Sequence, residues 1–255
     1  MQRYFLNLSY RGAPFHGWQS QPNALSVQEV IEDALSKVFR SEVKIVGAGR
    51  TDAGVNARRM IAHFDAPQPI TEAAGFLRAV NSITGRDIAV HSATPVHADA
   101  HARFDATSRT YRYYASTIKT PFFNQLCWQA PPALDFQAMN EAAALLLDID
   151  DFTSFAKLHT DTKTNICHVT RAIWRPVGIK GGWVFEISAD RFLRNMVRAV
   201  VGTLVDVGRR KLTIEGFRNV IEARDRCSAG TSMPAHALYL WDVTYPYYSA
   251  EDPVM

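Results

Sequence analysis

Residues 47–64 read GAGRTDAGVNARRMIAHF, and the pattern within this stretch indicates how the chain folds around it. The overlapping run VKIVGAG, residues 43–49, is typical of a strand. Beyond Asp52, side chains over residues 59–64 alternate with the period of two that a strand requires. The sequence therefore predicts that Asp52 lies on a glycine-rich loop that joins two strands.

The glycines around Asp52 allow three interpretations of this loop. They can supply a turn with positive φ, in which Asp52 is an ordinary turn residue, and an isolated Asp-x-Gly favours this interpretation. They can let the backbone approach a phosphate, but here a strand follows and the spacing is not that of a nucleotide-binding loop. They can also let a substrate reach a carboxylate whose charge a guanidinium such as Arg50 maintains.

Outward from this loop, the sequence predicts helices and strands along the whole chain. SVQE at 26–29 has capping-box spacing, and the apolar residues that follow share one helical face up to residue 39. Further helices are predicted at 71–83, 135–147, 193–207 and 214–224, and strands at 4–10, 87–96, 108–118, 168–177, 183–189 and 238–245. The predicted strands are more numerous than a chain of alternating strands and helices would need, and several neighbouring strands are joined by short turns. We therefore predict the α+β class.

The second part of the chain repeats the order of elements found in the first. We therefore predict two similar α+β halves, residues 1–105 and 106–255, whose antiparallel sheets could join, with helices on one face. The first half carries the Asp52 loop. The 255 residues are 47% hydrophobic, enough to form one large domain or two small ones.

The composition favours a cytoplasmic protein. The start MQRYFLNLSYRG lacks the apolar core of a signal peptide, and apolar runs such as 142–147 are too short to span a bilayer, so we expect no membrane association. Cys127, Cys167 and Cys227 are widely separated and odd in number, as expected in a reducing compartment.

The basic residues indicate a phosphate-rich partner. Net charge is only +3, but arginine makes up 21 of the 28 basic residues, and the planar guanidinium matches phosphate in a bidentate way. Arginines alternate with tyrosines over residues 103–119, and three more lie within 191–198. Such clusters can hold a nucleic-acid backbone and stack on a base, although a solvated arginine-rich surface explains the count alone equally well.

Two other chemistries have weaker support. His97 and His101 have a spacing that could bind zinc, but no third ligand is nearby, so we expect no metal. The run LLLDIDDFT at 145–153 is similar to the D-x-D stretch of haloacid-dehalogenase phosphatases, in which the first aspartate, here Asp148, is a nucleophile at a strand end. The residues before it are predicted to be helical. A magnesium-dependent phosphatase therefore stays a minor alternative.

Taken singly, these residues have ordinary explanations, but their motifs together resemble one family. The motifs are FHGWQSQ at 15–21, GRTDAGV at 49–55, HARF at 101–104, YRY at 111–113, DFTSF at 151–155, FLRNMVRAVVGTLVDVG at 192–208 and ALYLWDV at 237–243. They resemble the tRNA pseudouridine synthase A (TruA) family over almost the whole chain and in the family's order.

The resemblance implies a central antiparallel sheet with a deep basic cleft, and a homodimer that grips one tRNA across both subunits. It also implies isomerisation of uridine to pseudouridine at positions 38, 39 and 40 of the tRNA anticodon stem-loop, without cofactor or metal. By motif match Asp52 is the catalytic aspartate, acting as nucleophile or as base. Tyr111 is the tyrosine that stacks on the target base, Arg198 the arginine that faces the aspartate, and Arg50 belongs to the aspartate loop.

The chain departs from the family pattern at a few positions. Asn56 and Asn195 stand where the family often has histidine, and Leu147-Asp148 replaces a leucine-glycine pair. A non-catalytic tRNA-binding or folding protein on the same scaffold is the main alternative. Such a protein would not need Asp52, so the intact GRTDAG stretch favours catalysis.

Overall fold

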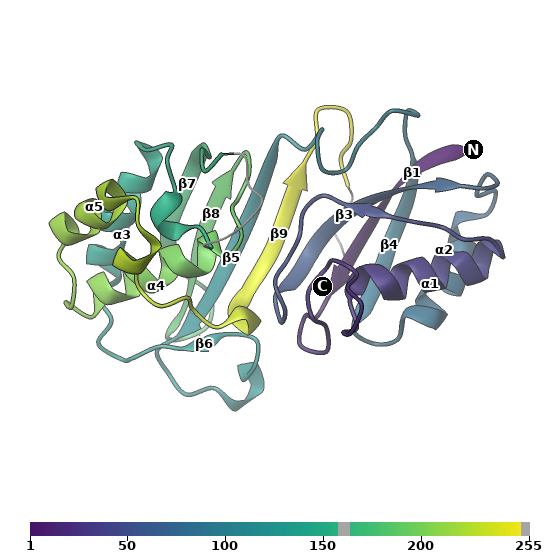
Figure 1. Cartoon of the computed structure of the whole chain (residues 1–255). Helices are drawn as coiled ribbons and strands as arrows, with labels where there is room; N and C mark the ends of the chain where they lie inside the picture. Colours follow the sequence, from purple (N-terminus) through teal and green to yellow (C-terminus); the bar gives the residue numbers. More distant parts are fainter. Residues whose placement is uncertain (158–163, 251–255) are drawn as a thin grey trace. The chain divides into compact units, whose positions relative to one another are not determined.

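The structure is a computed structural model that describes residues 1–157 and 164–250 (Figure 1). The chain divides into two compact units. Unit 1 contains Met1–Thr107 together with the segment from Leu240 onward, and unit 2 contains Ser108–Tyr239. Residues 106–255 were predicted to form the second half, and in the structure the segment from Leu240 onward belongs to unit 1.

Unit 1 is built on an antiparallel sheet. Its strands are β1 (Gln2–Tyr10), β2 (Val46–Gly47), β3 (Asn56–Ala66), β4 (Ile88–Pro95) and the part of β9 (Leu238–Thr244) that belongs to this unit. The order is β4-β1-β3-β9, and β2 pairs with β3. Leu6 pairs with Ala62 in the antiparallel register of β1 and β3. Two strands therefore flank the Asp52 loop, as predicted.

Two helices cover one face of this sheet (Figure 1). They are α1 (Val27–Phe39) and α2 (Ala73–Thr84), which pack against each other. The hydroxyl of Ser26 accepts the Glu29 N–H at 3.2 Å, so the predicted cap is formed. Ile31 and Leu35 on α1 are fully buried, as the spacing of the apolar residues requires.

The C-terminal segment covers the other face of the sheet. Neighbouring side chains of a strand point to opposite faces of the sheet, and Phe5 and Leu6 are both fully buried. Strand β1 therefore contributes to an apolar layer on each face. The ring of Phe5 lies 5.0 Å from that of Tyr245 and 5.1 Å from that of Tyr248. Tyr245 also donates its hydroxyl to the Ala102 carbonyl at 2.6 Å. These contacts explain why the segment after residue 239 joins unit 1.

Unit 2 is also built on antiparallel sheet structure and has its own helices. The strand order is β5 (Ser108–Ser116), β8 (Gly182–Ala189) and β7 (Val169–Pro176), and β6 (Trp128–Gln129) runs parallel to β5. Helices α3 (Phe136–Ala144), α4 (Met196–Gly208) and α5 (Ile214–Ala223) pack together over one face of this sheet (Figure 1).

The predicted α+β class with antiparallel sheets is confirmed. Residues 145–147 form a short 3-10 helix directly after α3, not a strand, so the backbone expected of a D-x-D phosphatase is not formed there. Asp150 instead forms an ion pair with His168, with Oδ1 and Nδ1 2.8 Å apart. Within residues 1–157 and 164–250 no helix is both long and apolar enough to cross a membrane.

Candidate active site

The Asp52 loop connects β2 to β3 and closes in a tight turn. The Val55 N–H donates to the Asp52 carbonyl at 3.1 Å, and Gly54 adopts a φ of +79°, which a residue with a side chain rarely does. Asp52 itself is half-buried, at the point where the chain reverses. The glycine therefore has the turn role that the sequence suggested, and this turn leaves the carboxylate side chain partly accessible.

A second loop, residues 11–20, fixes the backbone on both sides of Asp52. The Trp18 N–H donates to the Thr51 carbonyl at 3.2 Å, and the Gly54 N–H donates to the Phe15 carbonyl at 3.3 Å. The hydroxyls of Tyr10 and Thr51 share a hydrogen bond of 2.9 Å. Asp52 thus lies between two anchored neighbours, which limits the motion of its backbone.

This docking of one loop on the other requires glycine. A Cβ on Gly12 would lie 2.2 Å from the Val55 carbonyl oxygen. A Cβ on Gly17 would lie 2.5 Å from the Thr51 carbonyl oxygen, and Gly17 also has a φ of +95°. The glycine in FHGWQSQ therefore supports the Asp52 loop from a distance of more than thirty residues in sequence.

Asn56, one of the departures from the family pattern, has a defined structural task. It is 3% exposed, and its Oδ1 accepts the Gly12 N–H at 2.8 Å. This hydrogen bond satisfies a buried backbone donor at the place where the two loops meet. The amide therefore contributes to the same loop docking as the glycines.

Arg50 lies on the exposed side of the loop beside a small cavity. Its Nε donates to Gln19 Oε1 at 3.1 Å. The cavity has a volume of about 110 Å³ and is lined by Trp18, Gln19, Gln28, Ile45, Val46, Gly47, Gly49, Arg50 and Arg103. Two guanidinium groups therefore border one hollow next to the loop that carries Asp52.

In unit 2, Tyr111 lies on β5 and is half-buried. Its ring meets the ring of Phe192 edge to face, with centroids 4.9 Å apart. Tyr113 is two residues further along β5, on the same face, and is fully buried. Burial raises the pKa of the Tyr113 hydroxyl, and the positive charge of Arg198 partly opposes this increase.

Arg198 lies in the first turn of α4 and is held by the backbone of residues 230–233. Its Nε donates to the Met233 carbonyl at 2.6 Å, and the Met233 N–H donates to the Arg198 carbonyl at 3.1 Å. Asn195, the second departure from the family pattern, precedes the helix with a φ of 65°, which asparagine tolerates well. Its Nδ2 donates to the Ser232 hydroxyl at 2.6 Å, so the start of α4 is tied to the same segment.

The four predicted site residues fall into two pairs. Asp52 and Arg50 share one loop of unit 1, and Tyr111 and Arg198 belong to β5 and α4 of unit 2. Gln19 and Asn56 were not among the residues predicted for the site. The signal for Gln19 was present, since it is the glutamine of the FHGWQSQ motif.

The groups present suit chemistry on a nucleotide. Unit 1 supplies a carboxylate, guanidinium groups and a small cavity, and unit 2 supplies an aromatic ring and a further guanidinium. Within residues 1–157 and 164–250 no group of three or more histidine, cysteine, aspartate or glutamate side chains is placed to hold a metal ion.

Comparison with known proteins identifies the family. The model of a family described as tRNA pseudouridine synthase matches residues 8–105 and 142–246. A tRNA pseudouridine synthase A from Parabacteroides distasonis is 60% identical over 246 residues, which are 96% of this chain and 97% of the relative. Those of Porphyromonas gingivalis and Bacteroides thetaiotaomicron are 56% and 55% identical, over 96% of this chain and 98% and 91% of the relatives.

The chain therefore belongs to the tRNA pseudouridine synthase family, which is a family of isomerases. This confirms the family that the motifs predicted. The matched residues include the Asp52 loop, the HARF motif and all of α4.

Proposed function

We propose that this chain isomerises uridine to pseudouridine at positions 38, 39 and 40 of the tRNA anticodon stem-loop, with Asp52 as the catalytic residue. The observation that carries the proposal is the half-buried carboxylate on a loop whose backbone is anchored at Thr51 and Gly54. Relatives that are 55–60% identical and carry the name tRNA pseudouridine synthase A support the reaction. The protein acts as a cytoplasmic homodimer and uses neither metal nor cofactor.

The proposed reaction needs a carboxylate next to both the sugar and the base. The N1–C1′ bond breaks, the base rotates, a C5–C1′ bond forms, and the C5 proton is lost while N1 gains one. Asp52 serves either as the nucleophile or as the base that takes the C2′ proton. Preorganisation favours both routes, because the loop does not have to reorganise when the substrate arrives.

Tyr111 and the arginines act on the target base and its backbone in this proposal. A uridine in or beside a stem leaves the stack at a cost of a few kcal/mol, and stacking on an aromatic ring returns about 1 to 3 kcal/mol. Tyr111 offers a half-buried ring whose orientation is set by Phe192. Arg198 and Arg50 each supply a guanidinium that binds the substrate.

The deciding experiment uses tRNA transcript that carries tritium at C5 of uridine. We expect the protein to release tritium to water without added metal, and Asp52→Ala to release none while it still binds tRNA. If neither protein releases tritium and both bind tRNA, the isomerase proposal is wrong and a binding or folding role remains. Mapping of the pseudouridines in the product then tests positions 38, 39 and 40.

A further inference from the structure

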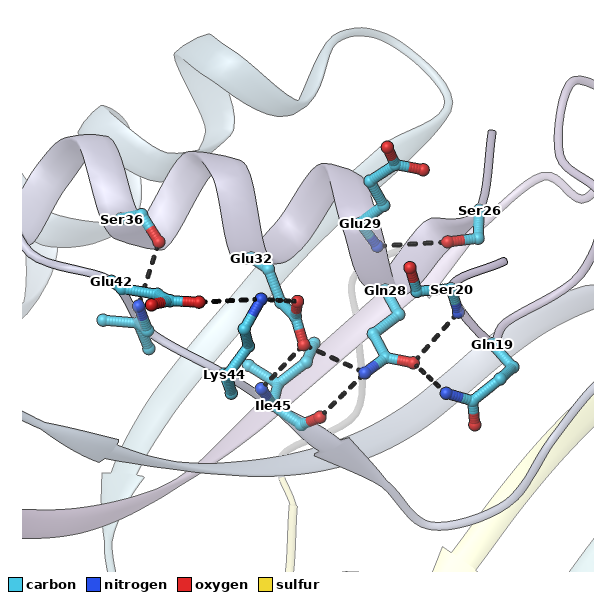
Figure 2. A network of polar contacts seen from close by, with 11 residues as sticks. Gln19, Ser20, Ser26, Gln28, Glu29, Glu32, Ser36, Glu42, Lys44 and Ile45 are labelled. Atoms are coloured by element: carbon cyan, nitrogen blue, oxygen red, sulfur yellow. Dashed lines mark hydrogen bonds and ion pairs between the residues drawn. The ribbon is translucent and has the colours of Figure 1, made fainter. Parts of the chain in front are cut away.

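A chain of hydrogen bonds runs from Arg50 through two glutamines to helix α1 in unit 1. Arg50 Nε donates to Gln19 Oε1 at 3.1 Å, and Gln19 Nε2 donates to Gln28 Oε1 at 2.9 Å. Gln28 Nε2 donates in turn to Glu32 Oε1 at 2.9 Å. Figure 2 shows the part from Gln19 to Glu32, with Gln28 at its centre. The guanidinium beside the Asp52 loop is therefore connected to a carboxylate on a helix.

The inner end of this chain is fixed by several partners. The side chain of Glu32 is 12% exposed, and its carboxylate accepts hydrogen bonds from Gln28, from the Ile45 N–H at 3.1 Å and from Lys44 Nζ at 3.2 Å (Figure 2). A carboxylate can only accept, so it selects the NH₂ end of the Gln28 amide. Glu32 thus determines which group donates and which accepts in every hydrogen bond of this series.

The orientation of the Gln28 amide in turn determines that of Gln19. Its Nε2 donates to Glu32 and to the Ile45 carbonyl at 3.1 Å, and its Oε1 accepts from Gln19 and from the Ser20 N–H at 3.1 Å (Figure 2). All four positions of the amide are used, so a rotated amide would place like groups against each other. Gln19 must then donate through Nε2, and its Oε1 is left to accept from Arg50.

The outer end of the chain leaves one edge of Arg50 open. Arg50 is exposed, and among the described residues, 1–157 and 164–250, its guanidinium has no hydrogen bond or ion pair besides that of Nε with Gln19. The two Nη groups are the part of a guanidinium that completes a fork with a phosphate. Arg50 lines the same cavity as Arg103.

We propose that Gln19 and Gln28 are positioning residues, which fix Arg50 by its Nε so that the Nη edge receives a phosphate of the RNA substrate. This inference rests on the proposed function, because it names the group on the substrate that Arg50 takes. An exposed arginine loses side-chain entropy when it binds, and an anchor at Nε removes part of that cost in advance. The anchor is neutral, so it leaves the full positive charge of Arg50 for the phosphate.

A double-mutant cycle tests the positioning role. We expect Gln19→Met to lower kcat/KM about fivefold, the size of one typical net hydrogen bond, and to change nothing further in an Arg50→Ala background. Gln28→Met should behave in the same way, because it removes the anchor of Gln19. Gln19→Glu retains an acceptor for Arg50 but neutralises its charge and cannot donate to Gln28, so it should not recover the activity.

Gln137→Met is the matched control, since Gln137 is an exposed glutamine of α3 that contacts Glu141 and not Arg50. It should retain wild-type kcat/KM, and both Gln19→Met and Gln137→Met should keep the wild-type melting temperature. An equal loss from Gln19→Met in the wild-type and Arg50→Ala backgrounds overturns the positioning role. Wild-type protein that forms no pseudouridine overturns the proposed function itself, which is a different outcome.

The phosphate contact has its own measurement. Binding of tRNA by wild type and by Arg50→Ala is compared as a function of salt concentration. We expect Arg50→Ala to reduce the slope of log Kd against log salt by about one, the value for one neutralised phosphate. An unchanged slope would show that the Nη edge meets a base or sugar, and would overturn this part of the inference.

Discussion

At the scale of the residue, the chemistry depends on one carboxylate. We expect Asp52→Asn to lower the rate of pseudouridine formation by at least about 10³-fold, because the amide neither attacks carbon nor takes a proton. The affinity for tRNA should change little. Tritium release from C5 and a filter-binding assay measure the two effects, and an active Asp52→Asn would remove Asp52 from the mechanism.

Tyr111 is expected to have two separable tasks. Tyr111→Phe keeps a ring that can stack on the base but lacks the hydroxyl, which we propose assists removal of the C5 proton. It should bind tRNA like wild type and turn over more slowly, whereas Tyr111→Ala should also lose stacking worth about 1 to 3 kcal/mol. Single-turnover rates and dissociation constants distinguish these effects. Unimpaired turnover by Tyr111→Phe rules out the second task.

His63 makes the stability of unit 1 depend on pH. Burial and the neighbouring His101 lower the pKa of His63 to about 4, from an ordinary value of 6.5. The fold therefore favours the neutral ring, whose Nδ1 accepts the Ala102 N–H at 3.1 Å. Stability from this group is fully present above pH 6.5 and is lost as the pH falls toward 4, because the unfolded chain then binds a proton that the native ring does not.

We therefore expect the free energy of unfolding to fall by about 2 kcal/mol between pH 6.5 and 4 on account of His63. Urea titrations across this range, on wild type and on His63→Asn, measure the difference. The variant should be less stable at pH 7 and should depend less on pH. The same slope in both proteins would contradict the assignment to His63.

At the scale of the element, two loops depend on each other through glycine. Gly17→Ala combines an unfavourable φ of +95° with a Cβ 2.5 Å from the Thr51 carbonyl oxygen. We expect it to destabilise the protein by about 1 to 3 kcal/mol and to reduce activity, because the Asp52 loop must move.

Gly49→Ala is the matched control for this change. Gly49 lies on the Asp52 loop, but a Cβ there would meet no atom within 4 Å. Its melting temperature should stay within a degree or two of wild type. Equal melting temperatures for the two variants would show that the close approach of Gly17 to Thr51 is not needed for stability.

The elements themselves were largely predictable. The helix at 27–39 could be predicted because its signals are local. The N-cap precedes the first helical residue, and successive apolar residues of the buried face are three or four positions apart. The ends of helices were less predictable. The helix predicted at 135–147 ends as an α-helix at Ala144 and continues as a 3-10 helix to Leu147. Helix ends depend on local packing and vary by a turn.

At the scale of the whole molecule, the arginine-rich composition should govern binding of tRNA. Because most contacts with the substrate are proposed to be with phosphates, we expect affinity for tRNA to fall at least about tenfold between 50 and 200 mM salt. Fluorescence anisotropy with labelled tRNA measures this response. A flat response would contradict a binding surface made mainly of guanidinium groups.

The sequence by itself determined the family, the loop between two strands that carries Asp52, and the main helices and strands. These features depend on residues that are near each other along the chain, or on a motif read as a whole. Only the tertiary structure decided that Gln19 anchors Arg50, 31 positions away, that Asn56 receives the Gly12 N–H, and that Tyr245 covers Phe5. Local periodicity fixes which face a side chain occupies, whereas contacts between distant segments exist only once the strands have paired and the loops have met.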